Sequence, residues 1–248
     1  MSVRRILALL VMFAMPIGIG SVSAQIPDKF TNLKVLPKDI SKRELIDIMR
    51  AFSDALGERC TYCHPGKNPD TLEGIDFASD ELKHKQISRD MMRMVGEIND
   101  RLIPAAGMKS PAQVRCVTCH RGVTEPESLD RVILSVAKEK GVDAAIGRYR
   151  ELRGQYYGTG SYSFSPGTLN TVAEKLAQEQ DNLAGAISVM KLNVEENPDA
   201  AYSHLLLGRF LAENGDREAA IASMERSLEL EPDNEWAKKL LEQTRGGE

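Results

Sequence analysis

Two copies of the pattern Cys-x-x-Cys-His restrict this chain more than any other feature. They stand at Cys60-Thr61-Tyr62-Cys63-His64 and at Cys116-Val117-Thr118-Cys119-His120. The chain has four cysteines, and the two copies use all of them. Two cysteines at this spacing present their sulfurs to the two vinyl-derived carbons of one porphyrin, and the histidine that follows binds the iron. The sequence therefore predicts two covalently attached haem c groups.

Three other chemistries use cysteines in pairs: zinc sites, thioredoxin-like redox pairs and structural disulfides. In a zinc site, the adjacent Cys63 and His64 could not both reach one tetrahedral ion without strain. A redox pair needs a strand-turn-helix setting, which neither copy has. The haem interpretation is favoured. It predicts Cys60, Cys63, Cys116 and Cys119 as attachment residues and His64 and His120 as proximal ligands.

The N-terminus has the three parts of a secretory signal peptide. Arg4 and Arg5 form the positive region, residues 6–19 are apolar, and the small residues at 22–24 form a cleavage site. We expect residues 1–24 to be removed after Sec-type export, which places the mature protein in the periplasm. The alternative is a retained segment that anchors the protein in the membrane. No cysteine follows the apolar run, so no acyl anchor is predicted there.

Charge excludes one class of partner. The formal net charge is −4, and loss of Arg4 and Arg5 makes it −6. No long basic block occurs in the chain. We therefore expect no nucleic acid partner.

A methionine opposite the histidine closes the iron site and raises its potential, whereas an open position permits ligand binding or catalysis. Ser41 and Glu44 form a capping-box pattern that opens a helix over 42–56. Met49 lies on the apolar face of this helix, eleven residues before Cys60.

A second methionine helix is predicted over 85–103. Met91 and Met94 share its apolar stripe, whereas Met92 lies off it. On such a stripe a methionine is more often core filling than a ligand. A haem motif follows each helix, however, and this order favours ligation. The stripe consists of Ile87, Met91, Met94, Val95, Ile98 and Leu102.

Two longer segments carry a family resemblance. The first is Met49-Arg-Ala-Phe, which precedes the first motif. The second is Arg-Asp-Met91-Met-Arg-Met-Val-Gly-Glu-Ile-Asn, which precedes the second motif. The second motif is itself followed by Arg-Gly. Over about residues 35–123 the chain resembles the cytochrome subunit of photosynthetic reaction centres. The resemblance implies Met49 as ligand of the first haem and Met91 as ligand of the second, with Met94 as the alternative. It also implies redox partners, with a reaction centre among them.

The chain departs from that family in two ways. The family carries four haems in two such pairs, and this chain has one pair. Residues 102–105 read Leu-Ile-Pro-Ala where the family uses a histidine to reach a further haem. A diheme relative that works in another periplasmic electron-transport chain is therefore an equal alternative. His84 and His204 are not expected to be ligands, because each motif has its own histidine.

The C-terminal half shows a 34-residue period typical of tetratricopeptide repeats. Two units are predicted at 167–200 and 201–234. Their matching residues are Ala186, Met190 and Pro198 in one unit and Ala220, Met224 and Pro232 in the other. A weaker helix pair is predicted at 128–140 and 142–153, with a long link at 157–161 and a closing helix at 236–243.

The predicted fold is all-α, with a diheme cytochrome c domain at 25–125 followed by a tetratricopeptide-like repeat at 128–245. The haems are expected to supply much of the core of the first domain. Two roles are expected equally for the repeat: it docks a partner segment in its concave groove, or it is a structural cap that packs on the cytochrome domain or mediates self-association.

The leading predicted function is electron transfer between periplasmic partners, without enzymatic activity. One alternative is a diheme peroxidase-like enzyme, which needs an iron with an open position. The other is a haem-free repeat adaptor whose cysteines form disulfides.

Overall fold

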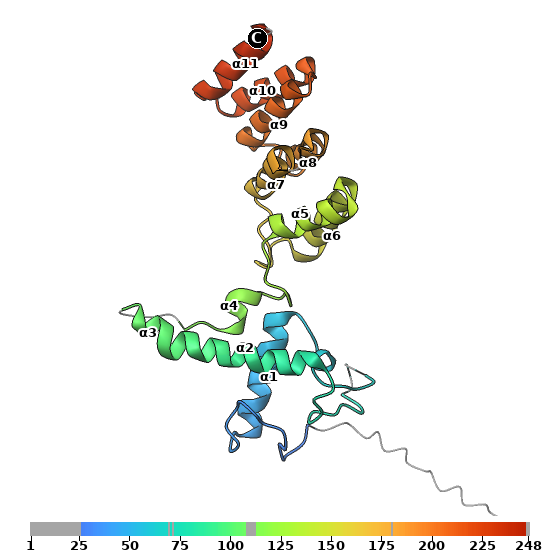
Figure 1. Cartoon of the computed structure of the whole chain (residues 1–248), viewed down its shortest axis with the longest axis vertical. Coiled ribbons are helices and arrows are strands. Elements are labelled where there is room, and N and C mark those ends of the chain that lie inside the picture. The colour runs from blue at the N-terminus through green and yellow to red at the C-terminus, as the bar shows by residue number, and fades with distance from the viewer. Residues whose placement is uncertain (1–25, 69, 71, 108–112, 180, 247–248) are drawn as a thin grey trace, which may run out of the picture. The chain divides into compact units, whose positions relative to one another are not determined.

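The computed structural model describes residues 26–68, 70, 72–107, 113–179 and 181–246. Every regular element in these residues is helical, which confirms the predicted all-α class (Figure 1). The predicted signal peptide at 1–24 lies outside them. Within the described residues, no helix has the length and apolar character to cross a bilayer.

The chain divides into two compact units. The first consists of the residues up to Ser53 together with Arg59–Val114, and the second of Asp54–Glu58 together with the residues from Arg115 onward. The second Cys-x-x-Cys-His motif thus belongs to the same unit as the helical repeat, whereas the sequence suggests a boundary at 125–128. The cause is local contact around the second motif, which is described below. Independent folding of residues 25–125 stays a prediction.

Helix α1 (Lys42–Leu56) has the predicted bounds. The side-chain oxygen of Ser41 accepts a hydrogen bond from the backbone N–H of Glu44 at 3.2 Å, which is one half of the predicted capping box. Leu45 is buried on the apolar face, and Met49 is half-buried one turn further on. The sequence pattern therefore places Met49 on α1 as expected.

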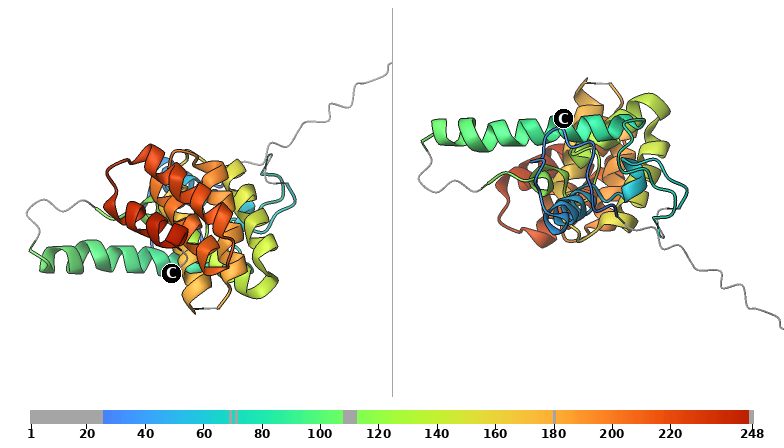
Figure 2. Two further views of the ribbon diagram at one scale, coloured as in Figure 1. Left: turned by 90° about the horizontal axis from the view of Figure 1, so that it is seen from above. Right: turned by 90° about the horizontal axis from the view of Figure 1, so that it is seen from below.

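The second methionine helix is longer than an ordinary α-helix. α2 (Lys83–Glu97), the π-helix η2 (Ile98–Leu102) and the short α3 (Ile103–Ala105) form one continuous rod (Figure 2). The predicted helix over 85–103 is thus found, with a start two residues earlier. The wider π turn was not predicted. Such turns are frequent at functional sites.

The first unit has almost no apolar core of its own. Among its described residues, Leu45 is the single hydrophobic side chain that is buried. A unit of this size folds only when it buries substantial apolar area or gains another source of stability. This observation fits the expectation that haem supplies much of the core.

A polar network ties α2 to the segment before α1. Arg89 is 6% exposed, and its guanidinium contacts the Asp80 carboxylate at 2.8 Å and donates to the Asn32 carbonyl at 3.1 Å. Lys34 also donates to Asp80, at 2.6 Å. The buried guanidinium is therefore paired, as a buried charge must be.

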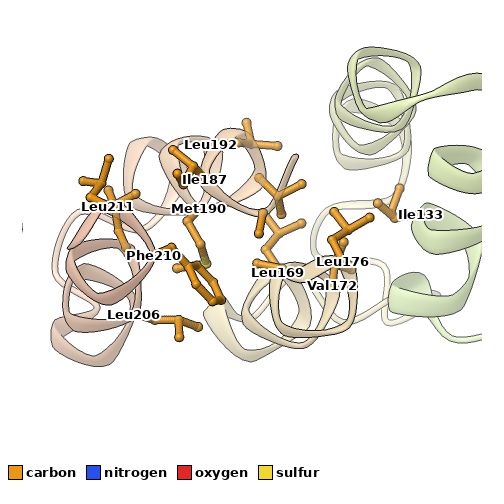
Figure 3. Packing of buried hydrophobic residues seen from close by; sticks show 14 of the residues in the cluster. Ile133, Leu169, Val172, Leu176, Ile187, Met190, Leu192, Leu206, Phe210 and Leu211 are labelled. Carbon is orange, nitrogen blue, oxygen red and sulfur yellow. The ribbon is translucent and has the colours of Figure 1, made fainter. Parts of the chain in front are cut away.

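In the second unit α5 packs on α6 and on α7, and from α7 onward each helix packs on the next one along the chain (Figure 1). Their buried residues form one cluster, in which Ile133 lies near Val172 and Leu176, and Met190 lies near Phe210 (Figure 3). The helices are α5 (Leu129–Lys140), α6 (Val142–Tyr156), α7 (Pro166–Glu179), α8 (Leu183–Glu196), α9 (Ala201–Glu213), α10 (Arg217–Leu230) and α11 (Glu235–Gly246).

The 34-residue register is confirmed by burial. Each helix pair buries a small residue and a large residue completely: Ala145 with Tyr149, Ala186 with Met190, and Ala220 with Met224. Gly208 on α9 allows a close approach, since a Cβ there would lie 2.7 Å from Cγ of Met224. The repeat is therefore tetratricopeptide-like, as predicted.

A buried polar cluster fixes the order of the repeat helices. The Asn193 amide on α8 donates to Oδ1 of Asn170 on α7 at 2.7 Å and to the hydroxyl of Ser203 on α9 at 3.2 Å. Asn193 and Ser203 are fully buried. Because buried polar groups need partners, this cluster selects one packing of the three helices.

We expect Asp80→Asn to lower the melting temperature of the holoprotein by several degrees at pH 7. Hydrogen bonds from Lys34 and then Asn32 hold the pKa of Asp80 well below its ordinary value. Its carboxylate therefore stabilises the fold above the unfolded-state pKa of about 4. This contribution is lost as the pH falls further toward the folded-state pKa. The difference between wild type and variant should thus persist at pH 5 and shrink below pH 4 in thermal unfolding followed by circular dichroism.

Asp90→Asn is the matched control for this prediction. Asp90 contacts Arg93 one turn away at 2.6 Å, and both side chains are about half exposed. Exposed pairs of this kind contribute little stability. Equal losses in the two variants would contradict the special role of Asp80.

Candidate functional site

The first motif folds as one tight turn. Cys60–Tyr62 form the 3-10 helix η1, and the backbone N–H of His64 donates to the Cys60 carbonyl at 2.9 Å. The N–H of Cys63 donates to the same carbonyl at 3.2 Å. Both cysteines and the histidine are thus on a single turn of chain, as attachment to one porphyrin requires.

His64 lies in an apolar setting. Its ring meets the edge of Phe77 with centroids 5.2 Å apart, and its Nδ1 atom is buried with no hydrogen-bond partner among the described residues. Burial, followed by the charge of Lys85, lowers the pKa of His64 to about 4. The ring is therefore neutral at pH 7, which is the form that binds a metal.

The first turn of α2 supports this motif from the side. The ring of His84 stacks on Tyr62 with centroids 4.0 Å apart and planes 9° apart, and His84 Nδ1 lies 3.0 Å from the Tyr62 carbonyl. One turn later, the Ser88 hydroxyl lies 3.7 Å from the Cys63 sulfur. Sequence reasoning set His84 aside as a non-ligand and missed this supporting contact, which joins residues 22 apart in the chain.

The second motif is a short α-helix. α4 (Cys116–His120) begins after Arg115, whose backbone N–H donates to the Thr118 hydroxyl at 3.0 Å. His120 Nδ1 lies 3.0 Å from the Val123 carbonyl. Because a carbonyl can only accept, Nδ1 carries the proton and Nε2 is left for a metal.

Asn99 holds the chain that leads toward the second motif. Its amide donates to the Val114 carbonyl at 2.8 Å, and its oxygen accepts from the Val114 N–H at 2.8 Å. Asn99 belongs to the π-helix η2, whose wider turn interrupts the helical periodicity. Sequence reasoning noted this asparagine only as part of a resemblance and did not assign it a role.

The methionines predicted as ligands lie on helices α1 and α2, as the sequence predicts. Met49 on α1 is half-buried, whereas Met91 and Met94 on α2 are 38% and 47% exposed. With Ile87 and Leu102 they form an exposed apolar stripe along the rod. Large exposed apolar patches mark surfaces that another group covers. Met91 belongs to the first unit and the second motif to the other, so their pairing stays a prediction.

The donor set fits haem c. No disulfide joins any of the four cysteines, so each sulfur can form a thioether bond. Burial raises the pKa of Cys116. Each motif adds one histidine, and the thioether sulfurs of the helix methionines are the soft ligands that haem iron accepts. His204, by contrast, lies in the repeat with Nε2 2.9 Å from the Pro198 carbonyl.

Comparison with known proteins also indicates a cytochrome c. The model of the family described as photosynthetic reaction centre cytochrome C subunit matches residues 17–161, more than half of the chain. Cytochrome c-554 of Chloroflexus aurantiacus is 36% identical over 99 residues, which is 40% of this chain and 22% of that protein. The photosynthetic reaction center cytochrome c subunit of Roseobacter denitrificans is 28% identical over 104 residues, 41% of this chain and 26% of that protein.

These matches span about a quarter of the length of the two relatives. Among solved structures, the first TPR of Spaghetti (RPAP3) bound to an HSP90 peptide aligns with a TM-score of 0.34 and 23% identity, over 48% of this chain and 89% of that one. The family match covers both Cys-x-x-Cys-His motifs and both methionine helices. The chain therefore belongs to the photosynthetic reaction centre cytochrome c subunit family.

Proposed function

We propose that this protein is an exported electron carrier with two covalent haem c groups, one at each motif. The observation that carries the proposal is that each motif puts two thiols and one histidine on a single turn. Haem held in this way supplies a one-electron iron couple. Cys60, Cys63, Cys116 and Cys119 would hold the two porphyrins, and His64 and His120 would bind the two irons.

The protein holds each histidine in the protonation state or tautomer that a metal ligand needs, before any metal binds. Burial keeps the His64 ring neutral, so no proton has to leave it. The Val123 carbonyl fixes the tautomer of His120 and directs Nε2 away from the backbone. Little rearrangement of either side chain is then needed when an electron arrives or leaves.

Methionine ligation would close both irons. Met49 is proposed for the first haem and Met91 for the second, with Met94 as the alternative on the same stripe. An iron with both axial positions filled carries electrons and does not bind substrate. This arrangement favours a carrier over the peroxidase-like alternative.

The proposed location is the periplasm. The support is the signal-peptide pattern at 1–24 and the use of every cysteine in haem motifs, whose cofactor is attached outside the cytoplasm. Retention of residues 1–24 would instead hold the protein at the membrane.

The repeat is proposed to dock redox partners, with a reaction centre among them. Residues 128–245 hold 19 acidic and 14 basic side chains, whereas residues 25–125 hold 15 acidic and 16 basic ones. The repeat thus carries most of the net negative charge. Complementary charge steers association, so the repeat suits a partner with a basic surface.

Intact-mass measurement tests the haem count. Protein from a host that matures c-type cytochromes should carry two haem adducts. Changing Cys60 and Cys63 to serine should remove one adduct, and changing Cys116 and Cys119 to serine should remove the other. Colourless protein with the mass of the bare polypeptide would leave only the adaptor interpretation.

Single methionine variants test the axial ligands. Met49→Ala should leave the first haem attached, lower its potential and convert it to a high-spin form, because the iron loses its sixth ligand. Met91→Leu and Met94→Leu, compared one at a time, identify the ligand of the second haem. Met92→Leu is the control, since Met92 lies off the stripe. Resting wild-type protein with a high-spin haem would support the peroxidase-like enzyme.

Truncation tests docking. A chain that ends at Glu127 should keep both haems, but it also loses the hydrogen bond from Ser161 to the Arg121 carbonyl, so the unchanged spectrum is expected for the first haem alone. Its electron exchange with purified photo-oxidised reaction centres should slow markedly, and its reaction with ferricyanide should not. The full-length rate should fall with rising salt, because docking is electrostatic. Equal rates for the two chains would exclude docking by the repeat, and no exchange by either would exclude the reaction centre as partner.

A further inference from the structure

The chain makes an unusual turn directly after the second motif. The backbone N–H of Val123 donates to the His120 carbonyl at 3.0 Å, which closes a β-turn around Arg121 and Gly122. Arg121 has φ 49° and ψ 39°, and Gly122 has φ 88°. Positive φ at both central positions is typical of a type I′ turn, in which arginine is rare at the first of them. Something other than residue preference must therefore hold Arg121 there.

The peptide between Arg121 and Gly122 is held at both of its polar atoms. Its N–H, on Gly122, donates to the Ala55 carbonyl at 2.8 Å. Its carbonyl, on Arg121, accepts from the Ser161 hydroxyl at 2.6 Å. Ser161 is 3% exposed, so water does not compete for this bond. The central peptide of the turn cannot rotate without losing both bonds.

The side of the turn that faces α1 is also closely packed. Gly57, with φ 69°, follows α1, and a Cβ at this position would lie 2.4 Å from the Gly122 carbonyl oxygen. Only glycine permits this approach of two backbone segments. Ala55 and Gly57 thus form one wall of the turn, and Ser161 forms the other.

Ser161 comes from an insertion in the repeat. α6 begins at Val142, α8 at Leu183 and α10 at Arg217, so the first interval is seven residues longer than the second. The inserted loop is anchored on α6, because the Thr159 hydroxyl donates to the Tyr156 carbonyl at 2.8 Å and accepts from the Ser161 N–H at 3.3 Å. The extra residues therefore place one buried hydroxyl next to the turn that follows the second motif.

We propose that Ser161 is a positioning residue for the haem held by the second motif. The fixed turn sets the position of the Val123 carbonyl, which accepts the proton of His120 Nδ1 at 3.0 Å. A strong bond at Nδ1 makes an imidazole a better donor to a metal through its other nitrogen. Ser161 thereby acts on the iron through the turn, without touching it. The proposal rests on the proposed haem at Cys116–His120.

The test compares Ser161→Ala with wild-type holoprotein. Loss of the hydroxyl should loosen the turn, weaken the His120 bond and shift the potential of the second haem to a more positive value, while the first haem stays unchanged. The two potentials are assigned with the Cys60→Ser/Cys63→Ser variant, which keeps the second haem alone. Amide exchange at Gly122 should become about fivefold to tenfold faster, because one hydrogen bond is lost.

Three further variants separate positioning from mere stability. Ser161→Thr keeps the hydroxyl and should restore the wild-type potential. Arg121→Gly in the Ser161→Ala background should also restore it, because glycine adopts positive φ without help. Ser163→Ala is the control, since Ser163 lies exposed in the same loop and should change neither potential nor exchange.

If Ser161→Ala carries two haems and the potential of its second haem is unchanged, the positioning role is wrong and the proposed function stays intact. A shift that Arg121→Gly fails to reverse would also overturn it, because the effect would not pass through the turn. Wild-type protein without haem at Cys116 and Cys119 would overturn the proposed function and the positioning role together.

Discussion

The constraint on which the first part of this protein depends lies within a few residues, because the proposed haem requires two cysteine sulfurs and an imidazole to reach the same porphyrin from one turn of chain. The backbone bonds from Cys63 and His64 to the Cys60 carbonyl produce such a turn in the first motif. Little else in that unit is rigid by its own packing, since Leu45 is its single buried hydrophobic residue in the described part. The polar ties of Arg89 and the stack of His84 on Tyr62 therefore hold the motif in a unit that lacks an ordinary core.

The repeat is stabilised in the opposite way. Its helices bury one continuous apolar cluster, in which small and large residues such as Ala186 and Met190 are both fully buried. The Asn193 cluster then selects one order of helices. A rigid array of this kind can present a fixed loop at a fixed place within its own unit. The inserted loop at Ser161 uses this rigidity to hold the Arg121 carbonyl.

Local patterns made most of the fold predictable. The capping box at Ser41, the methionine stripe on α2 and the 34-residue register all leave periodic signals in the sequence, and the helices lie within a few residues of their predicted bounds. The contacts that support the motifs leave no such signal. Asn99 to Val114 and Ser161 to Arg121 join residues 15 and 40 positions apart through single side chains. For the same reason the sequence predicts an ordinary loop at 157–161 and a boundary at 125–128, whereas the second motif groups with the repeat.

The two motifs share one pentapeptide pattern but differ in how their histidines are held. His64 Nδ1 is buried without a partner among the described residues, whereas His120 Nδ1 has the Val123 carbonyl at 3.0 Å. An imidazole with a bonded Nδ1 is the stronger donor to iron and favours the oxidised metal. The same pattern of residues thus places its histidine in two different settings, which are set by the neighbouring chain and not by the motif itself.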